Sequence, residues 1–138
     1  MKEIKHFFSS YAAAVWQKDA VSLLKLYDTD VIQYDMWDIG YYTTLEDWAP
    51  EIEVWLGSLG EEKVKVEFEK IKIFDSDTIA FAIGLIAFQA IDPKGAVLRK
   101  MKNRITVGFS KFTDGWKVVH QHISAPVSSE NLTAILDI

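Results

Sequence analysis

Two of the three histidines of this chain stand close together near its carboxyl end, in residues 116–124. This stretch has the alternation of a β-strand, in which every second side chain points to the same face. The expected row combines an indole, two imidazoles and a hydroxyl, and it consists of Trp116, Val118, His120, His122 and Ser124. Such a row can line a ligand cavity, hold a metal ion or form hydrogen bonds within a core.

Two imidazoles on one strand face have the spacing of metal ligands, but a metal site needs at least one more ligand. Asp35 or Glu67 would have to supply it from elsewhere in the chain, and no spacing in the sequence requires this. We therefore predict no metal site. His120 and His122 are instead interpreted as polar contacts in the wall of a ligand cavity, with a structural hydrogen-bonded pair as the alternative.

Asp35 is the carboxylate that is the best candidate for acid–base chemistry. In a strand over residues 30–37, Val31, Gln33, Asp35 and Trp37 would share one face, which places the carboxylate beside an indole. Apolar surroundings disfavour the charged form and raise the pKa of a carboxyl group towards that of a useful general base. The alternative is an ordinary aspartate at a strand end, bonded to backbone or solvent.

Aromatic side chains are frequent on either side of Asp35. Trp37 and Tyr41 are candidates for the rim of a ligand cavity. Trp48 and Trp55 occur at helical spacing and are expected in the core.

Composition excludes several classes of function. The 138 residues contain no cysteine, which excludes disulfides, thiol catalysis and thiolate metal sites, and which fits a cytoplasmic protein. A formal charge of −5 without any basic run argues against nucleic acid as a partner. No apolar run reaches the roughly 20 residues of a membrane-spanning helix, so we expect no membrane association. The 49% hydrophobic content supports one domain over residues 1–138.

The amino-terminal half has helical periodicity. Apolar residues from Ile4 to Val15 follow one face of a helix, and Asp19 can cap a second, shorter helix. A third helix is expected after the capping box formed by Thr43 and Glu46.

From residue 64 the period changes to two, which predicts strands. A slip of phase near residues 69–70 indicates a bulge. Residues 78–91 are apolar on both faces, so a second subunit is expected to cover one of them. Residues 97–112 and 115–125 form a hairpin, and Ser128 can cap a last helix. Helices followed by a bent antiparallel sheet give an α+β fold.

This order of elements resembles the SnoaL-like branch of the nuclear transport factor 2-like superfamily, which includes the ketosteroid isomerases. The likeness rests on residues 17–19 after the first helix, on residues 31–35 and on residues 114–124. The resemblance implies a cone-shaped, cystatin-like fold in which a curved sheet wraps the amino-terminal helices around an apolar cavity. It also implies a homodimer that forms through the sheet and a small apolar or aromatic ligand.

The resemblance also suggests roles for three residues. Asp35 falls where the isomerases carry the aspartate that removes a proton next to a carbonyl, and Tyr11 where they carry a tyrosine that donates to the oxyanion. Asn103 is the nearest counterpart of their second donor, a protonated aspartic acid. The implied chemistry is isomerisation, hydration or cyclisation without a cofactor. A ligand-binding module without catalysis and an oligomerisation module are the alternatives, and Tyr11 is then a core residue.

Overall fold

Helices cover one face of a long, curved sheet in the computed structural model, which describes residues 2–138. The helices are α1 (Lys2–Trp16), α2 (Ala20–Leu24) and α3 (Leu45–Gly57). The strands are β1 (Tyr27–Tyr34), β2 (Tyr41–Tyr42), β3 (Lys63–Asp75), β4 (Ile79–Ile91), β5 (Val97–Phe112) and β6 (Gly115–Ser124). The α+β class predicted from the order of periodicities is confirmed. None of the helices in residues 2–138 is long and apolar enough to cross a membrane.

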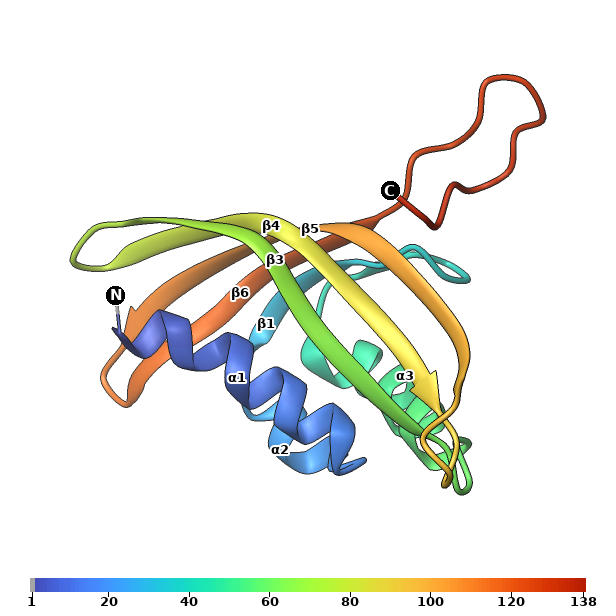
Figure 1. Cartoon of the computed structure of the whole chain (residues 1–138). Coiled ribbons are helices and arrows are strands. Elements are labelled where there is room, and N and C mark those ends of the chain that lie inside the picture. The colour runs from blue at the N-terminus through green and yellow to red at the C-terminus, as the bar shows by residue number, and fades with distance from the viewer. Residues whose placement is uncertain (1) are drawn as a thin grey trace.

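The sheet has the order β2-β1-β6-β5-β4-β3, and only the pair of β1 and β6 is parallel. It curves over the helices, so one face is concave and packed while the other faces away from them (Figure 1). The apolar face of α1 fills the concave side through Ile4, Phe7, Tyr11 and Val15, all of which are buried. Their spacing is the helical one expected from the sequence.

The caps of the two shorter helices follow from local side-chain chemistry. Asp19 caps α2 as predicted, since its carboxylate accepts a hydrogen bond of 3.0 Å from the backbone N–H of Ser22. The cap of α3 lies one residue later than the predicted Thr43. The hydroxyl of Thr44 accepts from the backbone N–H of Asp47 at 3.1 Å, so the helix begins at Leu45.

A bulge in β3 confirms the predicted slip of phase. The register against β4 shifts between Glu69 and Lys72, and Lys70 adopts a positive φ of 55°. Gly84 of β4 lies against this bulge. A Cβ atom there would stand 2.9 Å from the carbonyl oxygen of Glu69 and 2.4 Å from Cδ1 of Ile71. The close approach of the two backbones therefore requires glycine.

A second bulge, in β6, corrects the predicted histidine row. Phe109 pairs with Val118 but Gly108 pairs with His120, so Val119 is an extra residue. The extra residue reverses the faces of the strand beyond it. Val118 faces the core, whereas His120 and His122 point to the opposite face and Gln121 and Ile123 point inwards. The prediction of one shared face for residues 116–124 is wrong for this reason.

The outer face of the sheet carries an apolar patch. In β4 the small residues Ala80 and Ala82 face the core, while the bulky Ile79, Phe81 and Ile83 face outwards. The outer patch consists of these bulky residues and of exposed apolar or aromatic side chains on the same face of β3, β1 and β2, with β5 and β6 lying between β4 and β1. Every member is at least 40% exposed: Ile32, Tyr34, Tyr41, Phe74, Ile79, Phe81 and Ile83. The rings of Phe74 and Phe81 stack at 4.8 Å.

Residues 125–138 form no helix, contrary to the expectation from Ser128. They project from the body as a loop and return to it (Figure 1). A backbone hydrogen bond of 2.8 Å from the N–H of Lys102 to the carbonyl of Leu136 fixes the returning end against β5.

Replacing Gly84 by alanine should destabilise the fold by roughly 1–3 kcal/mol, because the backbone at the bulge has no room for a methyl group. Urea denaturation measures the change. Gly57→Ala is the matched control, since a Cβ at Gly57 meets nothing within 4 Å and should leave stability unchanged or slightly raised. Equal stability of the two variants would contradict the proposed steric clash between a side chain at position 84 and the bulge in β3.

Candidate functional site

A pocket of about 570 Å³ lies between α3 and the concave face of the sheet. Its walls come from α3, from the turn that follows β1, and from the inward side chains of β3, β4, β5 and β6. Five aromatic side chains make it largely apolar: Tyr11, Trp37, Trp48, Trp55 and Phe88. A second hollow of about 450 Å³, over Gln89 and residues 97–100, offers no aromatic ring and no carboxylate.

The pocket brings together four of the predicted site residues, which are Tyr11, Asp35, Trp37 and Asn103. Tyr41, His120 and His122 lie instead on the outer face of the sheet. There the two imidazole rings approach the ring of Tyr34 at 4.9 and 5.3 Å, and the ring of Tyr41 approaches it at 5.7 Å. These three residues therefore do not contribute to the wall of the pocket.

His120 has a structural hydrogen bond on that outer face. Its Nδ1 lies 2.7 Å from the carbonyl oxygen of Ile32 in the neighbouring strand. A carbonyl oxygen can only accept, so Nδ1 carries the proton in this contact. Within residues 2–138, no three histidine or acidic side chains are grouped so as to hold a metal ion.

Asp35 is placed by a tight turn at the end of β1. The strand ends at Tyr34 instead of continuing to Trp37, and the backbone N–H of Asp35 donates to the carbonyl of Gly40 at 3.0 Å. Gly40 has a φ of +69°, and a Cβ there would stand 2.8 Å from the carbonyl oxygen of Asp35. Glycine thus allows the turn that directs Asp35 towards the pocket.

The carboxyl group of Asp35 is held in an environment that favours its neutral form. Burial raises its pKa above the ordinary 3.8, and the charge of Glu51 adds to this. Backbone N–H groups act in the opposite direction, and that of Met36 donates to Oδ1 at 2.8 Å. The nearby indole of Trp48 also lowers the pKa, although its N–H has no hydrogen bond of good geometry. Burial is the largest of these influences.

Tyr11 approaches the same pocket from α1. Burial raises the pKa of its hydroxyl, and the negative charge of Asp35 raises it further. The two side chains are therefore close enough for their charges to interact. A raised pKa keeps the phenol protonated near neutral pH, so that it can donate a hydrogen bond.

Two further polar groups in the pocket wall have no partner among the described residues. Asn103 is fully buried, and neither its amide nitrogen nor its oxygen forms a hydrogen bond. The indole nitrogen of Trp48 is in the same situation. Each such group costs about 1–3 kcal/mol unless a ligand or water satisfies it. Unsatisfied polar atoms around an apolar space are typical of a binding site.

Gln121 is a pocket residue that sequence reasoning missed. Its Oε1 accepts a hydrogen bond of 2.6 Å from the hydroxyl of Tyr27, deep in the core. Only the bulge at Val119 brings Gln121 to the inner face, and alternation alone would have assigned it to the face opposite Val118.

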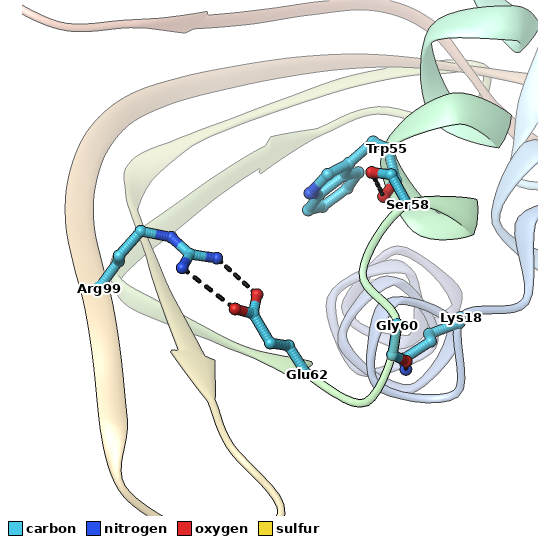
Figure 2. A network of polar contacts seen from close by, with 6 residues as sticks. All are labelled: Lys18, Trp55, Ser58, Gly60, Glu62 and Arg99. Carbon is cyan, nitrogen blue, oxygen red and sulfur yellow. Dashed lines mark hydrogen bonds and ion pairs between the residues drawn. The ribbon is translucent and has the colours of Figure 1, made fainter.

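An ion pair spans one edge of the pocket (Figure 2). The guanidinium of Arg99 donates to both carboxylate oxygens of Glu62, at 2.6 and 3.2 Å. The ring of Trp55 lies nearby on α3, and Lys18 binds the carbonyl of Gly60 in the adjacent loop. These contacts connect the end of α1, the loop after α3 and the start of β5.

Comparison with known proteins gives one family and many similar structures. A model of the SnoaL-like domain matches residues 4–128. No curated protein matches the chain. An NTF2-like protein of unknown function from Pseudomonas putida superimposes with a TM-score of 0.86 at 20% identity, over 99% of this chain and 94% of the other.

Two other structures are similar over most of the chain. One is a putative calcium/calmodulin dependent protein kinase II association domain from Xanthomonas campestris, with 20% identity, a TM-score of 0.76, and 91% and 86% of the two chains covered. The other is Aln2 from a Streptomyces species, with 10% identity, a TM-score of 0.75, and 88% and 87% covered. At these identities the similarity establishes the fold alone.

Asp35→Asn should make the protein more stable near neutral pH. The folded state raises the pKa of Asp35 above 3.8, so stability is lost as pH rises through the raised pKa, and an amide avoids this loss. Urea denaturation at several pH values should show a gain at neutral pH that disappears as pH falls towards 3.8. The exposed Asp30, changed to asparagine, should show no such gain. A less stable Asp35→Asn protein at neutral pH would contradict the assigned environment.

Proposed function

The chain belongs to the SnoaL-like family, and on this premise we propose that its pocket binds a small apolar or aromatic carbonyl compound and catalyses proton transfer next to the carbonyl. The observation that carries the proposal is the meeting of Asp35 and Tyr11 at one apolar pocket. One is a carboxylate with a raised pKa and the other a phenol that stays protonated. A base and a hydrogen-bond donor of this kind are what enolate chemistry needs.

The proposed reaction requires no cofactor. The carboxylate of Asp35 removes a proton from the carbon next to the carbonyl, and the electron pair of the C–H bond moves to form the enolate. Tyr11 donates a hydrogen bond to the enolate oxygen while charge develops there. Asp35 then returns the proton to another carbon, which isomerises the compound. When the proton on the carboxyl group first exchanges with solvent, its return to the same carbon introduces a solvent hydrogen there.

Asn103 supports this proposal as a second donor. Its amide nitrogen is buried in the same wall and has no partner in the described chain, so a ligand oxygen can satisfy it. An amide donates without titrating, unlike the protonated carboxyl group of the ketosteroid isomerases. The donor strength of the site would therefore not depend on the protonation of residue 103.

We further propose that the chain forms a homodimer through the outer patch. Seven exposed apolar or aromatic side chains on one face of a sheet are typical of a protein–protein interface. In a two-fold symmetric dimer the outer patch of each subunit would be buried against that of the other. The same patch is the specific observation that favours the second candidate function, that of an assembly module. In that case the pocket would have no catalytic role.

Proton exchange tests the catalytic proposal. The protein should accelerate incorporation of deuterium from deuterium oxide into para-tert-butylphenylacetone, whose methylene protons lie next to a carbonyl. Asp35→Asn should lower the rate by roughly a hundredfold or more, and Tyr11→Phe should lower it about tenfold to a thousandfold. Nuclear magnetic resonance measures the exchange.

The exposed Asp30→Asn serves as the control and should retain the full rate. Exchange should also decline below the raised pKa of Asp35, because only the carboxylate accepts a proton. An exchange rate that is the same for the native protein, for Asp35→Asn and for buffer would exclude the proposed base.

Sedimentation tests the dimer. The native chain should sediment as a dimer at micromolar concentration, and Phe81→Lys should shift it to a monomer, because two buried ammonium groups would face an apolar surface. Val21→Lys is the control, since Val21 is also exposed but belongs to α2 on the helical side. A native monomer would contradict the proposal.

A further inference from the structure

The charges that line the pocket are unevenly distributed. Three carboxylates, those of Asp35, Asp38 and Glu51, belong to the turn after β1 and to α3. Burial raises the pKa of Tyr42 and that of Asp35. All three carboxylates raise the pKa of Tyr42 further, and Glu51 adds to the raised pKa of Asp35, so they act on one region. Among the side chains that the structure describes, those of residues 3–138, no lysine or arginine forms an ion pair with any of the three.

The cations of the pocket lie at its other edge. They are Arg99 and Lys100 at the start of β5, and the guanidinium of Arg99 already donates two hydrogen bonds to the carboxylate of Glu62 (Figure 2). Neither of these cations forms an ion pair with Asp38 or Glu51, so the two carboxylates have no direct cationic partner among the described side chains.

Indole rings accompany these carboxylates. Trp37 precedes Asp38 in the turn and is half exposed, and Trp48 stands one helical turn before Glu51 in α3. The face of an indole attracts organic cations, and it does so most strongly among the aromatic side chains. Carboxylates and indoles in one wall are a combination that favours a positively charged group without a strongly bound water shell.

The unpartnered polar atoms deeper in the pocket are independent evidence for a ligand. Asn103 is fully buried and Trp48 almost so, and both lack hydrogen bonds while lining this pocket. The carboxylates thus border a site that needs polar contacts from a bound molecule.

We propose that the substrate is a carbonyl compound with an apolar or aromatic skeleton that carries an organic ammonium group. The ammonium group binds at Trp37, Asp38 and Glu51, the cation subsite, while the carbonyl reaches Tyr11. This inference rests on the function proposed above and adds the substrate class. An anionic group is disfavoured in the same place, because it would be repelled by the carboxylates.

Two isosteric ketones provide the test. A trimethylammonio group has nearly the shape of a tert-butyl group and differs from it in charge, so para-trimethylammoniophenylacetone is compared with para-tert-butylphenylacetone. Calorimetry should give a dissociation constant that is roughly tenfold lower for the cation. The preference should shrink at about 1 M salt, where exposed charges are screened beyond about 3 Å.

Two variants assign the preference to the cation subsite. Glu51→Gln and Asp38→Asn should each weaken binding of the cation about threefold or more, and should affect the neutral ketone much less. Glu53→Gln is the matched control, because Glu53 is exposed on the same helix but does not line the pocket. It should leave both constants unchanged.

The outcomes separate this inference from the proposed reaction. Equal binding of the two ketones, tighter binding of the neutral one, or no binding of either overturns the cation subsite. A preference that survives both Glu51→Gln and Asp38→Asn overturns it as well. If the cation binds better but neither ketone exchanges its protons, the subsite stands and the proposed reaction fails. If the neutral ketone exchanges without any preference for the cation, the reaction stands and the subsite fails.

Discussion

Strict alternation of side chains along a strand is the constraint on which this structure depends. One extra residue at Val119 decides that Gln121 faces the pocket and that His120 faces away from it. The bulge at Lys70 has a matching part on the neighbouring strand, where Gly84 of β4 lets β3 approach closely. Bulges strengthen the local twist and bend a strand. They therefore cause both the curvature of the sheet that leaves space over α3 and the selection of the side chains that line this space.

The sequence predicted the class of fold, the first helix, the cap at Asp19 and the bulge near Lys70, because each is encoded in neighbouring residues. The faces of β6 were not predictable in this way. Its bulge is visible only against its partner strands, because the residues around Val119 contain no glycine and the adjacent Val118 and Val119 fit either phase of a strand. The resemblance to the family suggested site roles for Asp35, Tyr11 and Asn103, and in the structure all three line one pocket. Trp48 was assigned to the core and is buried there, but one edge of it also lines the pocket.

Asp35 shows a conflict between stability and chemistry. A partly buried carboxylate disfavours the folded state near neutral pH, and among the described residues only the N–H of Met36 forms a hydrogen bond of good geometry with it. Stronger hydrogen bonding would stabilise the charge, but it would also lower the pKa and weaken the base. Asn103 shows the same conflict, since its unpaired amide lowers stability and leaves a donor available to a ligand. The apolar core around α1 offsets the stability that these two residues remove.

The placement of the tryptophans has a spectroscopic consequence. Three of the five indoles, at positions 37, 48 and 55, border one pocket. Trp37 is half exposed and emits from a polar environment, whereas Trp48 is shielded from solvent. Any molecule that expels water from this space alters the emission maximum or the intensity of these fluorophores, so the protein carries its own label-free reporter of occupancy. Libraries of compounds can thus be screened by intrinsic fluorescence before any reaction product is known.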